Sequence, residues 1–98
     1  MENLAIRRYY INHSDKHPIK MPEGAKLLYV EADKGHYYVH ALVDLNSSQT
    51  EKYYFKIYSV GLTHETKIQS DGFSYLGSVS TSFGDVNRVI HVFYSKSE

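Results

Sequence analysis

Apolar and polar residues alternate with a period of two along most of the chain, a pattern typical of β-strands with one buried face. No window of ten or more residues carries an apolar stripe with helical spacing, so we expect no α-helix. Turn residues divide the alternating segments at intervals of roughly ten residues, which predicts an all-β fold. We expect a single small antiparallel sandwich or barrel-like domain over residues 1–98, with residues 95–98 as a frayed tail. The seven expected strands are Leu4–Ile11, Ile19–Met21, Lys26–Asp33, His36–Asp44, Lys52–Val60, Phe73–Ser80 and Arg88–Tyr94.

Glycine and proline mark the turns between these strands. Pro22-Glu23-Gly24 predicts a tight turn, and Lys34-Gly35 predicts a two-residue hairpin turn in which Gly35 has a positive φ. Further turns are expected at Gly61–Glu65 and at Asp71-Gly72, and a loop that contains Gly84 joins the last two strands.

The alternation also predicts which side chains form the core. In the segment 36–44 the inward residues are Tyr37, Val39, Ala41 and Val43, and in the segment 52–60 they are Tyr53, Phe55 and Ile57. In the segment 26–33 the inward set is Leu28, Val30 and Ala32, and the outward set is Leu27, Tyr29 and Glu31.

Length, charge and cysteine content narrow the class of protein. A chain of 98 residues has room for one modest core, so a sizeable pocket should be shallow or shared within a homo-oligomer. The absence of cysteine excludes disulfides and thiolate metal sites. The chain has 11 Lys+Arg and 11 Asp+Glu, and this balance disfavours binding to a nucleic-acid backbone. Its apolar stretches are far shorter than the roughly 20 residues of a membrane span, and no signal peptide is recognisable, so we expect a cytoplasmic protein.

Tyrosine is the most unusual component, with ten residues that include three consecutive pairs. Because neighbours in a strand point to opposite faces, each pair should place one ring in the core and one on the surface. The rings expected outward are Tyr29, Tyr38, Tyr54 and Tyr58, together with His40 and Lys56. Three interpretations remain open: a platform that stacks on nucleobases, a subunit interface, and an ordinary pleated surface.

Histidine and arginine supply the remaining candidate chemistry. His36 and His40 lie roughly 13 Å apart on one strand face, too far to share a metal ion, so no metal site is expected. His64, next to Glu65, is the best local acid/base candidate, whereas His91 fits a partly buried histidine with a satisfied hydrogen bond. No catalytic or cofactor-binding motif occurs, so we expect neither a catalytic residue nor a cofactor. The ligand-binding candidates are Arg7, Arg8, Tyr38, His40, Tyr54, Lys56, Tyr58, His64, Arg88 and His91.

Four segments give the chain a resemblance to a family of short proteins. They are Met21–Leu28, Ala41–Asp44, Tyr75–Val79 and His91–Phe93. Together they resemble an uncharacterised family of all-β proteins that is frequent in bacteriophage and prophage genomes. His40 stands where members of that family often have tryptophan before the Ala-Leu-Val-Asp run, and residues 58–64 are a looser form of their Gly-Thr-Gly-His turn. The resemblance implies a small phage-type β protein without established enzymatic activity.

The functional expectation that follows is binding rather than turnover. The leading hypothesis is an oligomeric phage accessory protein that sequesters a small nucleotide-derived immune signal of the host. In that hypothesis an outward tyrosine stacks on a base and an arginine or lysine holds a phosphate. The alternatives are an inhibitor that binds a host protein, a structural phage protein, and an enzyme that degrades a signalling nucleotide with His40, His64 or His91 as its acid/base group.

Overall fold

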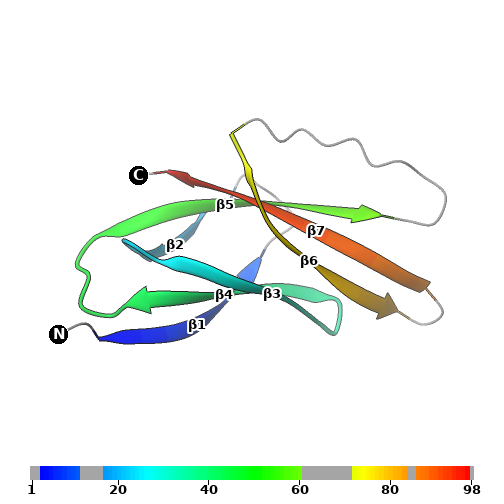
Figure 1. The fold of residues 1–98 in the computed structure, drawn as a ribbon, viewed down its shortest axis with the longest axis horizontal. Coiled ribbons are helices and arrows are strands. Elements are labelled where there is room, and N and C mark those ends of the chain that lie inside the picture. Colours follow the sequence, from blue (N-terminus) through cyan, green and yellow to red (C-terminus); the bar gives the residue numbers. More distant parts are fainter. Residues whose placement is uncertain (1–2, 12–16, 61–71, 84–85, 98) are drawn as a thin grey trace.

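Seven antiparallel strands form two sheets in a computed structural model of the chain, which describes residues 3–11, 17–60, 72–83 and 86–97. The strands are β1 (Leu4–Ile11), β2 (Ile19–Pro22), β3 (Lys26–Asp33), β4 (His36–Asp44), β5 (Thr50–Val60), β6 (Ser74–Phe83) and β7 (Val86–Ser97). One sheet has the order β1-β4-β3 and the other the order β2-β5-β7-β6, and neither closes into a barrel. The predicted all-β sandwich is confirmed (Figure 1). Within the described ranges no helix is long and apolar enough to cross a membrane.

The core lies between the inward rows of the two sheets. The β1-β4-β3 sheet contributes Ile11, Val30, Tyr37, Val39, Ala41 and Val43, and the other sheet contributes Met21, Tyr53, Phe55, Ile90 and Val92. All four inward residues expected from the segment 36–44 are buried, as are Tyr53 and Phe55. Because every second residue of a strand points inward, the same alternation leaves each sheet with an outer face directed away from the core.

A β-bulge corrects one part of the predicted core. The register of β3 against β4 shifts between Leu27 and Tyr29, so one residue is inserted there. As a result Leu27 joins Val30 and Ala32 on the inner side, whereas Leu28, expected inward, is exposed beside Tyr29. The prediction from strict alternation was therefore wrong for Leu27 and Leu28, because the inserted residue exchanges the inward and outward positions there.

The end of the chain differs from the expectation of a frayed tail. Ser95, Lys96 and Ser97 continue β7 and pair with Tyr54, Tyr53 and Lys52 of β5. The backbone hydrogen bonds of this ladder hold the segment in the sheet, so the frayed tail was wrong for residues 95–97. Residue 98 lies outside the described residues, as do the expected turn at 61–65 and the loop at Gly84.

Two turns place the strands that matter for the site. Ala25 N donates to Pro22 O at 3.2 Å, and Gly24 has φ 85°, so residues 22–25 form the expected tight turn between β2 and β3. The β3–β4 hairpin turns at Lys34-Gly35 as predicted, but both residues have positive φ, 52° and 82°. Two such residues define a type I′ turn, whose twist matches that of the flanking strands.

This turn yields a stability prediction, because lysine is strained in the left-handed region that asparagine adopts more readily. We expect Lys34→Asn to raise the free energy of unfolding by about 0.5–1 kcal/mol. Gly35→Ala should lower it, because the added Cβ is unfavourable at this φ whatever space surrounds it. Urea unfolding measures both changes. A Lys34→Asn protein no more stable than the original would contradict the turn assignment.

Candidate functional site

The sequence-predicted binding residues separate into two groups on different sheets. Tyr38 and His40 lie on the outer side of β4, with Arg8 and Tyr29 beside them on β1 and β3. Tyr54, Lys56 and Tyr58 lie instead on the outer side of β5 in the other sheet, with His91 opposite Tyr58 on β7. The expectation of one tyrosine face was therefore wrong. Alternation reveals which side of a strand a residue occupies, but not which sheet the strand joins.

The group on the β1-β4-β3 sheet forms a connected network. The Arg8 guanidinium lies 4.0 Å from the centre of the Tyr38 ring and 3.5 Å from Glu31 Oε1. His40 Nε2 is 2.8 Å from the same carboxylate oxygen, and the Tyr29 ring meets the His40 ring edge to face. The hydrogen bond from His40, with a smaller contribution from Arg8, holds the pKa of Glu31 below its usual value. These partners already satisfy the charges of the network, which reduces its capacity to hold a free phosphate.

The group on the other sheet is more dispersed. The Tyr58 and Phe93 rings lie 5.8 Å apart, and Lys56 Nζ lies 4.5 Å from the centre of the Phe73 ring. His91 Nδ1 is hydrogen-bonded to Tyr75 Oη at 3.0 Å, so His91 has the hydrogen-bond partner that its strand position suggested. The last three candidates do not join either group: Arg7 lies on the opposite side of β1 from Arg8, Arg88 is exposed near the start of β7, and His64 is outside the described residues.

A cleft between the two sheets forms a concave site in the described part of the chain. It lies where β3 of one sheet packs against β6 of the other, and its volume is about 470 Å³. That volume lies within the range of small-molecule sites, roughly 300–1,000 Å³. The cleft is lined by Ala25, Lys26, Leu27, Tyr53, Tyr75, Leu76, Tyr94 and Lys96.

Two of the strands that border the cleft, β3 and β6, shift register at the cleft itself. The bulge in β3 falls between Leu27 and Tyr29, and β6 shifts its register on β7 between Tyr75 and Gly77. Leu27, Tyr75 and Leu76 line the cleft as a result of this irregular geometry. Bulges often re-aim side chains next to functional sites, so their coincidence here supports a binding role for the cleft.

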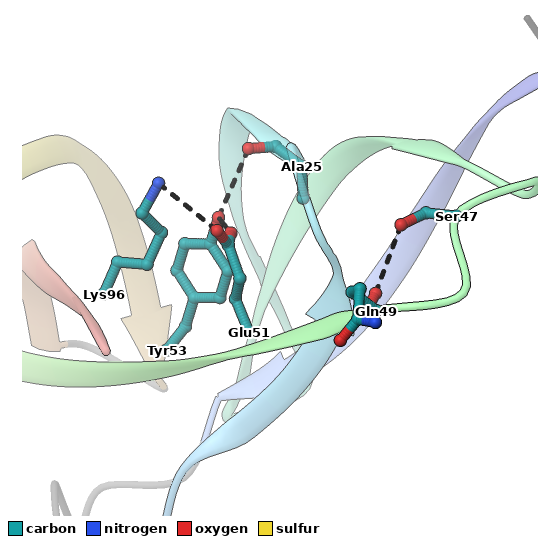
Figure 2. Close-up of polar contacts among 6 residues, drawn as sticks. All are labelled: Ala25, Ser47, Gln49, Glu51, Tyr53 and Lys96. Carbon is teal, nitrogen blue, oxygen red and sulfur yellow. Dashed lines mark hydrogen bonds and ion pairs between the residues drawn. The ribbon is translucent and has the colours of Figure 1, made fainter. Parts of the chain in front are cut away.

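Tyr53, one of the lining residues, has a hydroxyl proton that two acceptors share. Tyr53 Oη lies 3.3 Å from both the Ala25 carbonyl oxygen and Glu51 Oε2 (Figure 2). A phenol has a single proton to donate, so neither acceptor receives a full hydrogen bond from it. Lys96 Nζ is 3.7 Å from Glu51 Oε1, which partly balances a carboxylate that is only 8% exposed.

These surroundings hold Tyr53 in its neutral form. Burial, together with the charge and hydrogen bond of Glu51, raises the pKa of Tyr53 to about 12. At neutral pH the phenol is therefore a hydrogen-bond donor and a poor nucleophile. Lys26, at the start of β3, makes no ion pair within the described residues and lines the same cleft. The cleft thus combines aromatic walls and two ammonium groups with acceptors that have spare hydrogen-bonding capacity.

None of the residues lining this cleft was among the candidates selected from the sequence. A signal that could have revealed it is the row Glu51-Tyr53-Phe55, because Glu51, expected in the loop before the strand, is the first inward residue of β5. A buried carboxylate requires a partner, and such a position is a general marker of functional sites. The partners themselves come from β7 and from the turn before β3, which sequence spacing does not bring together.

Comparison with known proteins gives a family but no characterised relative. Residues 2–98 match the model of a family described as a domain of unknown function (DUF7352). No curated protein and no solved structure matches the chain significantly.

The raised pKa of Tyr53 generates a pH prediction. Because the folded pKa lies above the ordinary value of 10, the native state holds this proton more tightly than the unfolded state between pH 10 and 12. The stability contribution of Tyr53 is present below pH 10 and is lost as the pH rises through about 12. The free energy of unfolding should fall less steeply over this interval in Tyr53→Phe. An ultraviolet difference titration of the original protein against Tyr53→Phe should show one tyrosine that ionises at a pH of about 12. A midpoint near pH 10 for this tyrosine would contradict the assigned environment.

Proposed function

The chain belongs to the DUF7352 family, and we propose that it is a binding protein whose cleft between β3 and β6 takes a small nucleotide-type ligand. The observation that carries the proposal is the composition of the cleft, which combines tyrosine rings, the ammonium groups of Lys26 and Lys96, and two acceptors that share one proton. This combination matches a ligand with a flat ring, an anionic group and N–H or O–H donors.

Each part of such a ligand has a matching group in the cleft. Tyr75 and Tyr94 offer ring faces and edges to a base, an interaction worth about 1–3 kcal/mol per base. Lys26 and Lys96 supply ammonium groups for a phosphate. An amino group of the base or a ribose hydroxyl donates to the Ala25 carbonyl or to Glu51, and Tyr53 keeps the other acceptor.

The pKa of Tyr53 supports one part of this proposal, namely that the protein binds its ligand without converting it. A phenol with a pKa of about 12 stays protonated at neutral pH and orients a ligand rather than attacking it. The biological setting that we propose is a phage-type accessory protein in the bacterial cytoplasm. There it would sequester a nucleotide-derived defence signal, in line with the resemblance of its turn and core segments to phage proteins.

Isothermal titration of the full chain with AMP, ADP-ribose and cyclic di-AMP tests this proposal. We expect at least one of them to bind with a Kd on the order of 1–100 µM, and adenosine or inorganic phosphate alone to bind more weakly. Chromatography after long incubation should recover the ligand unchanged. Conversion of the ligand would instead indicate an enzyme, and the absence of binding by every nucleotide at about 1 mM would refute the proposal.

Variants locate the ligand in the cleft. Lys26→Met removes a cation that has no ion-pair partner among the described residues, so the fold should persist while affinity falls by roughly 10-fold or more. Lys20→Met on β2 is the matched control, because this exposed lysine does not line the cleft. Equal losses of affinity in the two variants would place the ligand elsewhere.

A further inference from the structure

The first strand, β1, lies at an edge of the three-stranded sheet, and its register shows which backbone groups that edge presents (Figure 1). Leu45 N donates to Asn3 O at 2.8 Å, one step before the pair of Leu4 and Asp44. Because hydrogen-bonded and non-hydrogen-bonded pairs alternate along an antiparallel ladder, the odd-numbered residues of β1 exchange hydrogen bonds with β4. The N–H and C=O groups that point away from β4 are those of Leu4, Ile6, Arg8 and Tyr10.

This edge of β1 is regular along the whole strand. All of its residues, from Leu4 to Ile11, pair with β4 without a shift in register. The side chains of Ile6, Tyr10 and Leu4 lie on the outer side and are 64%, 50% and 48% exposed. A strand that pairs with β1 here would bond the outward-pointing backbone groups. It would also cover part of these side chains, because residues opposite one another in a ladder have Cβ atoms about 4.5–5.5 Å apart.

Arg7 determines the charge that such a strand meets. β1 contains two arginines and no acidic residue. Arg8 already contacts Glu31 and the ring of Tyr38. Arg7, opposite Ala41 on the other side of the strand, is exposed and makes no ion pair with any described residue. An added strand places one residue directly opposite Arg7, and opposite charges stabilise such cross-strand pairs.

We propose that β1 pairs with an extended acidic segment of a partner protein, which adds to this sheet as a further antiparallel strand. Apolar residues of the segment lie on the outer side, beside Ile6 and its exposed neighbours. An acidic residue lies between them on the inner side, opposite Arg7. The backbone hydrogen bonds supply affinity, and the alternation of apolar and acidic side chains supplies specificity.

The same register disfavours a second copy of β1 as the added strand. If two copies pair antiparallel through all four outward-pointing residues, Arg7 lies opposite Arg7 of the second copy. Like charges directly opposite one another destabilise a strand pair. A register shift of two residues separates the two arginines, but it moves one of the four residues beyond the paired part of β1. An acidic segment pairs with the full edge and also neutralises Arg7.

Isothermal titration with a synthetic peptide tests the proposal. The probe is an acetylated and amidated peptide in which four valines alternate with three glutamates, so that its central glutamate lies opposite Arg7. At low ionic strength we expect a Kd on the order of 10–100 µM. The same peptide with lysine in place of glutamate should bind roughly 3- to 10-fold more weakly. Absence of binding at about 1 mM, or equal affinity for the two peptides, overturns the proposal.

Amide hydrogen exchange locates the peptide on β1. In the free protein the amides of Ala5, Arg7 and Tyr9 should exchange slowly, because they donate to β4, and those of Ile6 and Arg8 should exchange fast. The peptide should slow the amides of Ile6 and Arg8. N-methylation of its two central valines, whose N–H groups face β1, should weaken binding by roughly 10-fold or more, and N-methylation of its two outer glutamates should not. Protection at another strand, or the opposite dependence on methylation, contradicts the proposed pairing.

Charge reversal tests the contact with Arg7. Arg7→Glu should fold, because this side chain has no ion pair among the described residues, and it should bind the lysine peptide more tightly than the glutamate peptide. Lys20→Glu is the matched control, with the same change of charge at an exposed position of β2, an edge strand of the other sheet. Circular dichroism checks the fold of both variants. A reversed preference in Lys20→Glu as well would show a nonspecific charge effect and refute the contact.

Two further measurements separate this proposal from its alternatives. Light scattering should find a monomer of 11.3 kDa in the absence of peptide, and a dimer that the glutamate peptide does not dissociate would overturn the choice of partner. The residues that line the cleft come from strands other than β1 and from the turn before β3. Nucleotide titration of Arg7→Glu should therefore match that of the original protein, so the two proposals can fail independently.

Discussion

Burial of the two inner rows against each other is the interaction on which the rest of the structure depends. A chain of 98 residues has one core, and here this core consists of alternate residues from two small sheets. The residues that alternate with them along the described strands are consequently directed outward, so each sheet has an outer face, and the two sheets meet at an edge. The candidate cleft lies at this edge, where β3 packs against β6.

The strands and most of the core could be predicted because both depend on local alternation. Val39, Ala41 and Val43 are buried as the pattern of their segment indicates. The error at Leu28 has a local cause that the pattern does not report, because a bulge inserts one residue without changing the composition of the strand.

The site could not be predicted to the same extent, because it depends on contacts between distant segments. Tyr53 was expected inward, and it is buried, but its acceptor at Ala25 belongs to the turn before another strand. Lys96 reaches Glu51 only because the end of the chain continues β7 along β5. Likewise, no local pattern distinguishes the sheet that contains Tyr38 from the sheet that contains Tyr54.

The two bulges also affect how readily the sheet edges could pair with a strand of another chain. β3 and β6 are edge strands, and both are bulged where they pack against each other, so neither presents a regular ladder to a neighbouring chain. β2 is only four residues long and ends at Pro22, which has no N–H to donate. Among the described strands this leaves β1 as the edge with a long, uninterrupted row of backbone donors and acceptors, where a misfolded or extended chain would add as a further strand.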